Sequence, residues 1–254
     1  MHWTEKHIAA AIGIGLATIV PVSGLNAGPI VIKYEGRGSE SYKPGKKLIP
    51  NAKISLKAGE IVTILDERGT RILRGPGTFS SSSSASVKNV SNTSLAALIT
   101  TSSVRRARTG AVRGDGSVAL QAASPNLWFV DVAKSGKVCV ADFNNLQLWR
   151  SNAEFAREIT TTDVATGTVA STQFGKGQMT VRWPATLMPA NGKVFAFTMP
   201  GKAEKASARI VQVALTGEER LDTMAATLIE NGCQIQAELL AARFMQAEPA
   251  PAGG

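Results

Sequence analysis

Histidine serves most often in acid–base catalysis and metal binding near neutral pH, and this 254-residue chain has only two, His2 and His7. Both precede an uncharged apolar segment, residues 8–26, that is typical of a secretory signal peptide. Removal of that segment would leave a chain without histidine. The sequence therefore excludes Ser-His-Asp and Cys-His catalysis and histidine metal sites in the mature protein.

Carboxylates are then the main candidates for acid–base chemistry. The six that stand out by position are Asp66, Glu67, Asp131, Asp142, Glu218 and Glu219. The first pair fits a hairpin turn, the last pair fits a helix cap, and the middle two lie in or beside consecutive strands. Two such groups facing each other across a cleft would support a hydrolase acting on envelope glycan, which is our alternative hypothesis. No phosphate-binding loop of the Walker type and no Ser-x-x-Lys pair occurs, and we predict no cofactor and no metal.

The two cysteines, Cys139 and Cys233, suit an oxidising compartment. An even pair in an exported protein predicts one disulfide, and two buried free thiols are the alternative. A bond that closes so long a loop would stabilise the fold by about 4–5 kcal/mol in the chain-entropy treatment. It would also fasten the C-terminal helices to the sheet that holds Cys139.

Arg105, Arg106, Arg108 and Arg113 form the densest cluster of charge in a chain whose net charge is +9. Such a cluster suits an anionic lipid headgroup, an anionic polysaccharide or an acidic protein face. A solvated linker is the alternative interpretation. We do not predict nucleic-acid binding, because no aromatic residues for base stacking are interleaved with the arginines.

The N-terminal residues 1–27 predict a signal peptide cleaved near Ala27, which would place the protein in the periplasm or outside the cell. The alternative is an uncleaved anchor, and only then do we expect membrane contact. Residues 28–79 predict a small antiparallel β domain with strands near 30–34, 60–66 and 70–74, the last two joined by a tight turn. Residues 80–124 are rich in serine and predict a linker with a short helix starting near Leu95.

Residues 125–246 predict a second, β-sandwich-like domain that ends in a pair of helices, and residues 247–254 predict a disordered tail. A hairpin is expected between strands at 127–132 and 137–142. The first helix is expected to follow a capping box at Thr216–Glu219, and the second to bury Ile235, Leu239, Leu240 and Phe244. Three tryptophans, Trp128, Trp149 and Trp183, suit core packing better than a sugar-stacking platform. The predicted fold class is mainly β (α+β).

The segment LKAGEIVTILDERGTRILRGPGTF, residues 56–79, resembles the periplasmic FecR-like domain, in which a strand bounded by glycine precedes a hairpin with an acidic-Gly turn. The whole sequence is also similar to a group of exported bacterial proteins that have this β segment first and a cysteine-containing β domain second. The resemblance implies a role in sensing at the cell envelope or in binding another envelope component.

We therefore expect an exported, non-enzymatic binding or sensory accessory protein of the bacterial cell envelope. Its expected partner is an envelope protein or an anionic envelope polymer. The sequence makes no prediction about the oligomeric state.

Overall fold

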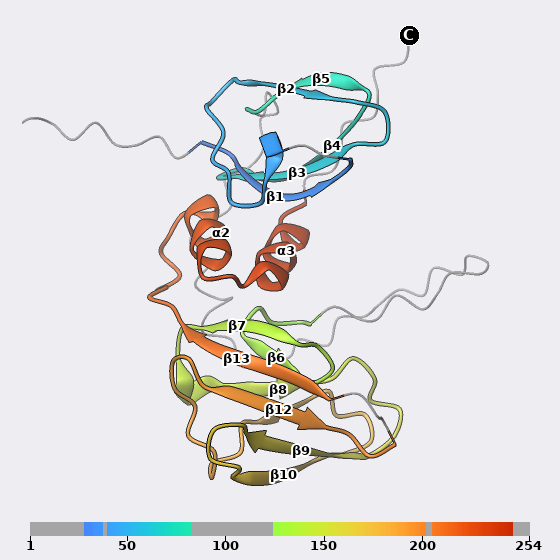
Figure 1. The fold of residues 1–254 in the computed structure, drawn as a ribbon, viewed down its shortest axis with the longest axis vertical. Coiled ribbons are helices and arrows are strands. Elements are labelled where there is room, and N and C mark those ends of the chain that lie inside the picture. The colour runs from blue at the N-terminus through green and yellow to red at the C-terminus, as the bar shows by residue number, and fades with distance from the viewer. Residues whose placement is uncertain (1–27, 38–39, 83–123, 202–204, 246–254) are drawn as a thin grey trace, which may run out of the picture.

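A computed structural model of the chain describes residues 28–37, 40–82, 124–201 and 205–245. It has two β regions with a pair of helices between them (Figure 1). The predicted fold class, mainly β with two C-terminal helices, is confirmed. The predicted signal peptide, the helix start near Leu95 and the tail from residue 247 lie outside the described residues. Within the described ranges, no helix is long and apolar enough to cross a membrane.

The N-terminal β unit, residues 28–82, is built from two antiparallel sheets that enclose a small apolar core. The first sheet has the order β1-β3-β4, with β1 at Ile30–Glu35, β3 at Ile61–Asp66 and β4 at Gly69–Arg74. The second pairs β2 at Lys53–Leu56 with β5 at Gly77–Ser80, and a 3-10 helix η1 at Glu40–Tyr42 precedes it. The predicted hairpin is present as β3–β4, and the Asp66 carboxylate accepts the Arg68 N–H in its turn at 2.8 Å.

The first half of strand β1, residues 30–32, is covered on both faces, which explains its continuous apolar run. Ile30 and Ile32 pack toward the helices, whereas Val31 packs into the core between the two sheets. Because successive side chains of a strand point to opposite faces, a strand buried on both sides needs apolar residues at every position. The N-terminal β unit therefore has two apolar interfaces, one internal and one with the helices.

The C-terminal β unit, residues 124–215, is a mixed five-stranded sheet packed on a three-stranded one. The larger sheet has the order β10-β9-β12-β13-β7, with bounds Val169–Phe174, Arg157–Asp163, Val194–Thr198, Ala206–Gln212 and Gly136–Val140. The smaller has the order β11-β8-β6, with bounds Thr180–Arg182, Gln147–Trp149 and Phe129–Asp131, and a 3-10 helix η2 at Phe143–Asn145 lies before β8. Apolar side chains from both sheets form one core.

The hairpin expected between residues 127–132 and 137–142 is wrong. Strand β6 pairs in parallel with β8, and β7 pairs in parallel with β13, so the two consecutive strands belong to different sheets. Val130 of β6 and Val140 of β7 both contribute to the core between those sheets. The chain switches sheets at the intervening turn because this lets both strands bury apolar side chains in the same core.

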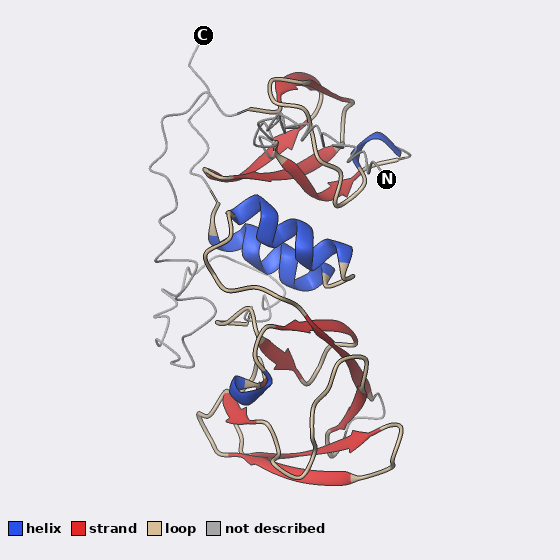
Figure 2. Ribbon diagram, turned by 90° about the vertical axis from the view of Figure 1, so that its left-hand side faces the viewer, coloured by secondary structure: helices blue, strands red, loops and turns tan. Residues whose placement is uncertain are grey.

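Two antiparallel helices, α2 at Leu221–Glu230 and α3 at Gln234–Arg243, lie between the β units (Figure 2). The predicted capping box forms: the Glu219 carboxylate accepts the N–H groups of Thr216 and Gly217, both at 2.8 Å, and the Thr216 hydroxyl accepts the Glu218 N–H at 3.3 Å. Helix α2 follows it and begins at Leu221. The predicted burial of Ile235 in α3 is wrong. Its side chain is 41% exposed, whereas the neighbouring Gln236 is 4% exposed.

The helices bind the two β units together through one shared core. That core contains Ile30 and Leu65 of the N-terminal unit, Leu127 and Val213 of the C-terminal unit, and the inner face of both helices. After α3 the chain returns to the N-terminal unit, where the Phe244 carbonyl accepts the Thr70 N–H of β4 at 2.7 Å. The first and last described parts of the chain therefore fold against each other.

Candidate binding surfaces

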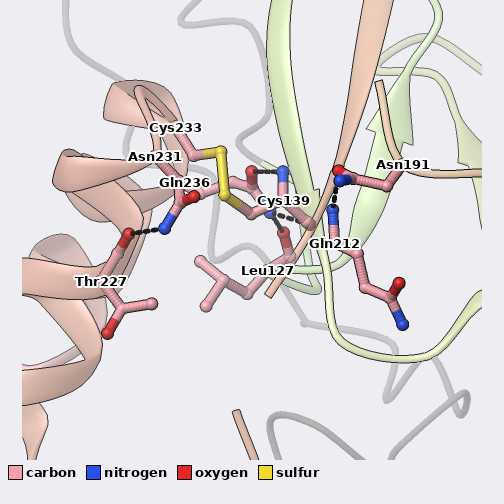
Figure 3. Close-up of a disulfide and its surroundings, with 8 residues drawn as sticks. All are labelled: Leu127, Cys139, Asn191, Gln212, Thr227, Asn231, Cys233 and Gln236. Carbon is pink, nitrogen blue, oxygen red and sulfur yellow. Dashed lines mark hydrogen bonds between the residues drawn. A yellow bond between two sulfur atoms is a disulfide. The ribbon is translucent and has the colours of Figure 1, made fainter. Parts of the chain in front are cut away.

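Cys139 and Cys233 form the predicted disulfide, which joins β7 to the start of α3 (Figure 3). Both residues are fully buried, and 94 positions separate them in the sequence. The bond fixes the helical pair to the five-stranded sheet, as the sequence predicted. Neither sulfur is a thiol in this structure, so this pair has a structural role.

Gln236, beside the disulfide, covers the outer edge of β7 with its side-chain amide (Figure 3). Its Oε1 accepts the Cys139 N–H at 2.7 Å, and its Nε2 donates to the carbonyls of Cys139 and Leu127 at 2.9 and 2.8 Å. The Gln236 amide thus makes the hydrogen bonds to Cys139 that a neighbouring strand would otherwise make. The helical periodicity of the sequence placed apolar residues on the buried face, so it gave no signal for a buried glutamine.

The strand edges of the N-terminal β unit are also covered at several positions. Along β1, Val31 exchanges hydrogen bonds with the segment after η1, donating to the Lys46 carbonyl and accepting from Gly45. Along β2, the Tyr42 hydroxyl accepts the Ser55 N–H at 3.1 Å and donates to the Ser55 carbonyl at 3.3 Å. Beyond β5, the Arg71 guanidinium donates to the carbonyls of Ser80 and Ser81.

A small pocket lies between the β6–β7 turn and α3, and Asp131 is the one carboxylate in its lining. Burial raises the pKa of Asp131, against the opposing effects of the Ala133 N–H at 2.9 Å and of Lys134 at 3.8 Å. The pocket volume is about 40 Å³. Sites for small organic ligands usually enclose roughly 300–1,000 Å³, so this pocket suits a few water molecules better than a substrate.

Two of the other candidate carboxylates, Asp142 and Glu67, bind neighbouring groups of the protein. Asp142 accepts hydrogen bonds from the backbone and side chain of Asn144 and from the side chain of Asn145. Glu67 pairs with Arg220 at 2.7 Å, which links the β3–β4 turn to the start of α2. Within the part of the chain that the structure describes, no group of three or more histidine, cysteine or acidic residues is placed to hold a metal ion.

The three tryptophans considered above lie in the core of the C-terminal β unit and at its boundary with the helices. Trp128 and Trp149 are 7% and 1% exposed. Trp183 is half-buried, packs edge-on against Phe195 with ring centroids 4.8 Å apart, and donates its N–H to the Leu187 carbonyl. The preference for core packing over a sugar-stacking platform is therefore confirmed.

An exposed turn of the N-terminal β unit, residues 46–53, combines positive charge with an apolar side chain; we call it the lysine turn. The Ile49 side chain is 77% exposed, and the lysines on either side of it, Lys46, Lys47 and Lys53, are exposed too. Residues 28–82 carry ten lysines and arginines against five acidic residues, whereas residues 124–245 carry twelve against eleven. This turn is not among the sites predicted from the sequence, although its paired lysines and isolated isoleucine are a local signal for it.

The chain enters its folded part beside the lysine turn. Pro29 accepts the Leu48 N–H at 2.7 Å, so residue 28 lies next to the turn. The apolar segment predicted to be a signal peptide or an anchor therefore joins the fold at this point. The predicted arginine contacts, Arg105, Arg106, Arg108 and Arg113, lie outside the described residues, and the structure leaves that prediction untested.

No protein-family model matches the chain, and comparison with curated proteins and with solved structures finds no similar protein. The FecR-like resemblance of residues 56–79 stays a prediction.

Proposed function

We propose that the protein is an exported, non-enzymatic binding protein of the bacterial cell envelope that contacts an anionic lipid surface through the lysine turn. The observation that carries the proposal is the 77% exposure of Ile49 between exposed lysines. This arrangement concentrates both interactions that hold a protein at a lipid interface in one short turn.

The two residue types would act at different depths of the bilayer. Each lysine near an anionic surface contributes about 1 kcal/mol of attraction. Ile49 would leave water for the boundary between headgroups and acyl chains, which adds a hydrophobic contribution. An anionic polysaccharide would attract the lysines equally but would not bury Ile49, so the exposed isoleucine favours lipid.

Three further features support an exported location. The buried Cys139–Cys233 disulfide is typical of an oxidising compartment. The apolar N-terminal segment is typical of export and joins the fold beside the lysine turn. The FecR-like resemblance agrees with a role at the envelope, as a sensor or as an accessory to another component.

Vesicle sedimentation tests the lipid contact. We expect the protein to sediment with vesicles of phosphatidylglycerol and phosphatidylcholine and to stay in solution with phosphatidylcholine alone. Raising the salt concentration should release it, because screening weakens the lysine contribution. Ile49→Ser should weaken binding at constant charge, and Lys46→Glu with Lys47→Glu should abolish it.

Met188→Ser is the matched control for Ile49→Ser. Met188 is 72% exposed, so it resembles Ile49 in exposure, but it lies in the C-terminal β unit. We expect this variant to bind as the unchanged protein does. Equal binding to neutral vesicles, or equal loss with both serine variants, would contradict the proposal.

The intact mass of the protein from its native envelope tests export. A mass that starts at Gly28 and lacks two hydrogens relative to the dithiol would support cleavage and the disulfide together. A full-length mass with both thiols open to alkylation without reductant would overturn export.

A further inference from the structure

Strand β10 forms one end of the five-stranded sheet, and its outer edge has no pairing partner among the described residues. On its inner side it pairs antiparallel with β9, from Val169 opposite Thr162 to Phe174 opposite Arg157. The register shows which backbone groups face outward. Asp163 donates its N–H to the directly opposite Thr168, and hydrogen-bonded pairs recur at every second residue.

Ala170, Thr172 and Phe174 therefore direct their N–H and C=O groups toward β9. Val169, Ser171 and Gln173 direct theirs away from the sheet. The open edge thus presents three N–H donors and three C=O acceptors in a regular row.

Among the residues that the structure describes, β10 lacks the features that usually prevent edge-to-edge pairing. Exposed edges are commonly protected by charged residues, prolines, bulges or a covering loop. The sequence of β10, VASTQF, has no charge and no proline, and its register with β9 is continuous. Val169 is 56% exposed, and Val164 in the turn that leads into β10 is 57% exposed. Additional pairing would cover apolar surface as well as backbone groups.

We propose that β10 pairs antiparallel with β10 of a second copy of this chain, so that two five-stranded sheets join into one. The strand is complementary to itself. When Ser171 lies opposite Ser171 of the second copy, Val169 lies opposite Gln173, and all outward backbone groups of both strands are paired. A shift by two residues leaves one outward residue of each strand without a partner.

This self-complementarity is the reason to choose a second copy over an unrelated peptide. No like charges meet in the symmetric register, because Ser171, Val169 and Gln173 are neutral, and Lys176 lies opposite Thr166. A two-fold axis through Ser171 makes the contact closed, which limits the assembly to a dimer. The proposal is independent of lipid binding, since β10 belongs to the C-terminal β unit and the lysine turn to the N-terminal one.

Sedimentation equilibrium of the full chain tests the dimer. We expect a concentration-dependent mass that approaches twice that of the chain. Ser171→Lys places two lysines directly opposite each other and should raise the dissociation constant by roughly tenfold or more. Ser207→Lys is the matched control, because Ser207 has the same residue type on the same face of the sheet but lies on β13, away from the edge. It should leave the dissociation constant unchanged.

Cysteine cross-linking tests the register. Ser171→Cys should form an intermolecular disulfide under mild oxidation, because directly opposite Cα atoms in an antiparallel pair are about 4.5–5.5 Å apart. Ser207→Cys should stay monomeric in the same gel without reductant. A mass that remains that of one chain at every concentration overturns the proposal. So does a dimer that Ser171→Lys leaves intact, or cross-linking that is equal at the two positions.

Discussion

The two β units end their sheets in different ways. In the N-terminal unit, other parts of the same chain bind the edges at single positions: a loop pairs with β1 at Val31, the Tyr42 hydroxyl with β2 at Ser55 and the Phe244 carbonyl with β4 at Thr70. In the C-terminal unit, the Gln236 amide covers β7, whereas the outer edge of β10 has no partner among the described residues.

The strand edges in this fold are covered by residues that are distant in sequence from the strands. Gln236 lies 97 positions from Cys139, and Phe244 comes from the last described segment of the chain. The helices and the residues after them therefore complete both β units. Strand β10 lies at the end of the molecule away from these helices (Figure 1), and no described element pairs with its outer edge. The open edge is thus a consequence of the topology.

Amide hydrogen exchange should show the largest difference between the two kinds of edge. We expect the amides of Val31, Thr70 and Cys139 to exchange only through large openings, with free energies approaching the global stability of about 5 kcal/mol or more. The outward amides of Val169, Ser171 and Gln173 should exchange with free energies near zero in dilute protein. Exchange followed by NMR measures each amide separately.

The inward amides of β10 are the internal control for that experiment. Ala170 and Thr172 lie in the same strand but pair with β9, so they should be protected. Raising the protein concentration should protect the outward amides as well, if the dimer forms. Equal protection of inward and outward amides in dilute protein would mean that another part of the chain covers the edge.

Removing the Gln236 amide from the outer edge of β7 should have the next largest effect, and it should lower the free energy of unfolding. Gln236→Leu preserves the approximate volume but leaves the Cys139 N–H and two carbonyls without partners. Each unsatisfied buried group costs about 1–3 kcal/mol, so we expect a loss of about 3 kcal/mol or more in the free energy of unfolding. Urea denaturation measures it. Gln212→Leu, at an exposed position, is the control and should change stability by less than about 0.5 kcal/mol.

The edges also mark the limit of what the sequence could predict. Local patterns identified the β3–β4 hairpin and the cysteine pair, because turn residues and residue type are local signals. The sheet switch between β6 and β7 depends on a core shared by two sheets, and the burial of Gln236 depends on the outer edge of a strand 97 positions away. No local pattern contains that information. The lysine turn differs, because its paired lysines and isolated isoleucine are adjacent in the sequence and form a local signal.

Tyr42→Phe tests the edge of β2, where a single hydroxyl group binds the Ser55 backbone. The ring would keep its contact with Tyr34, whose centroid lies 6.1 Å away, while the Ser55 N–H and carbonyl would lose their partner. Ser55 is exposed, so water can replace the hydroxyl in part. We expect a loss of about 1 kcal/mol in the free energy of unfolding and faster exchange of the Ser55 amide. Unchanged exchange of that amide would show that the hydroxyl does not protect β2.

Acidification should have the smallest effect on local stability. It should act on strand β10 through the Asp163 carboxylate. This carboxylate closes the turn between β9 and β10: it pairs with Lys193 at 2.9 Å and accepts the Ala165 N–H at 3.0 Å. The hydrogen bond from Lys193, helped by the turn N–H groups, lowers the pKa of Asp163. A folded-state pKa below the unfolded one stabilises the fold at neutral pH, and that contribution is lost as the pH falls through the folded-state pKa.

We therefore expect acidification to lower the opening free energies of the inward amides of β10 before it lowers those of Val31 or Thr70. Asp163→Asn retains an oxygen for the turn but loses the charge that pairs with Lys193. In this variant the opening free energies of the β10 amides should be lower at neutral pH and should respond less to acid. Glu60 provides the comparison in the N-terminal β unit, because the Lys57 N–H also lowers its pKa. Glu60→Gln should leave the acid response of β10 as it is. If Asp163→Asn leaves that response unchanged too, the loosening of the open edge comes from net charge and not from this turn.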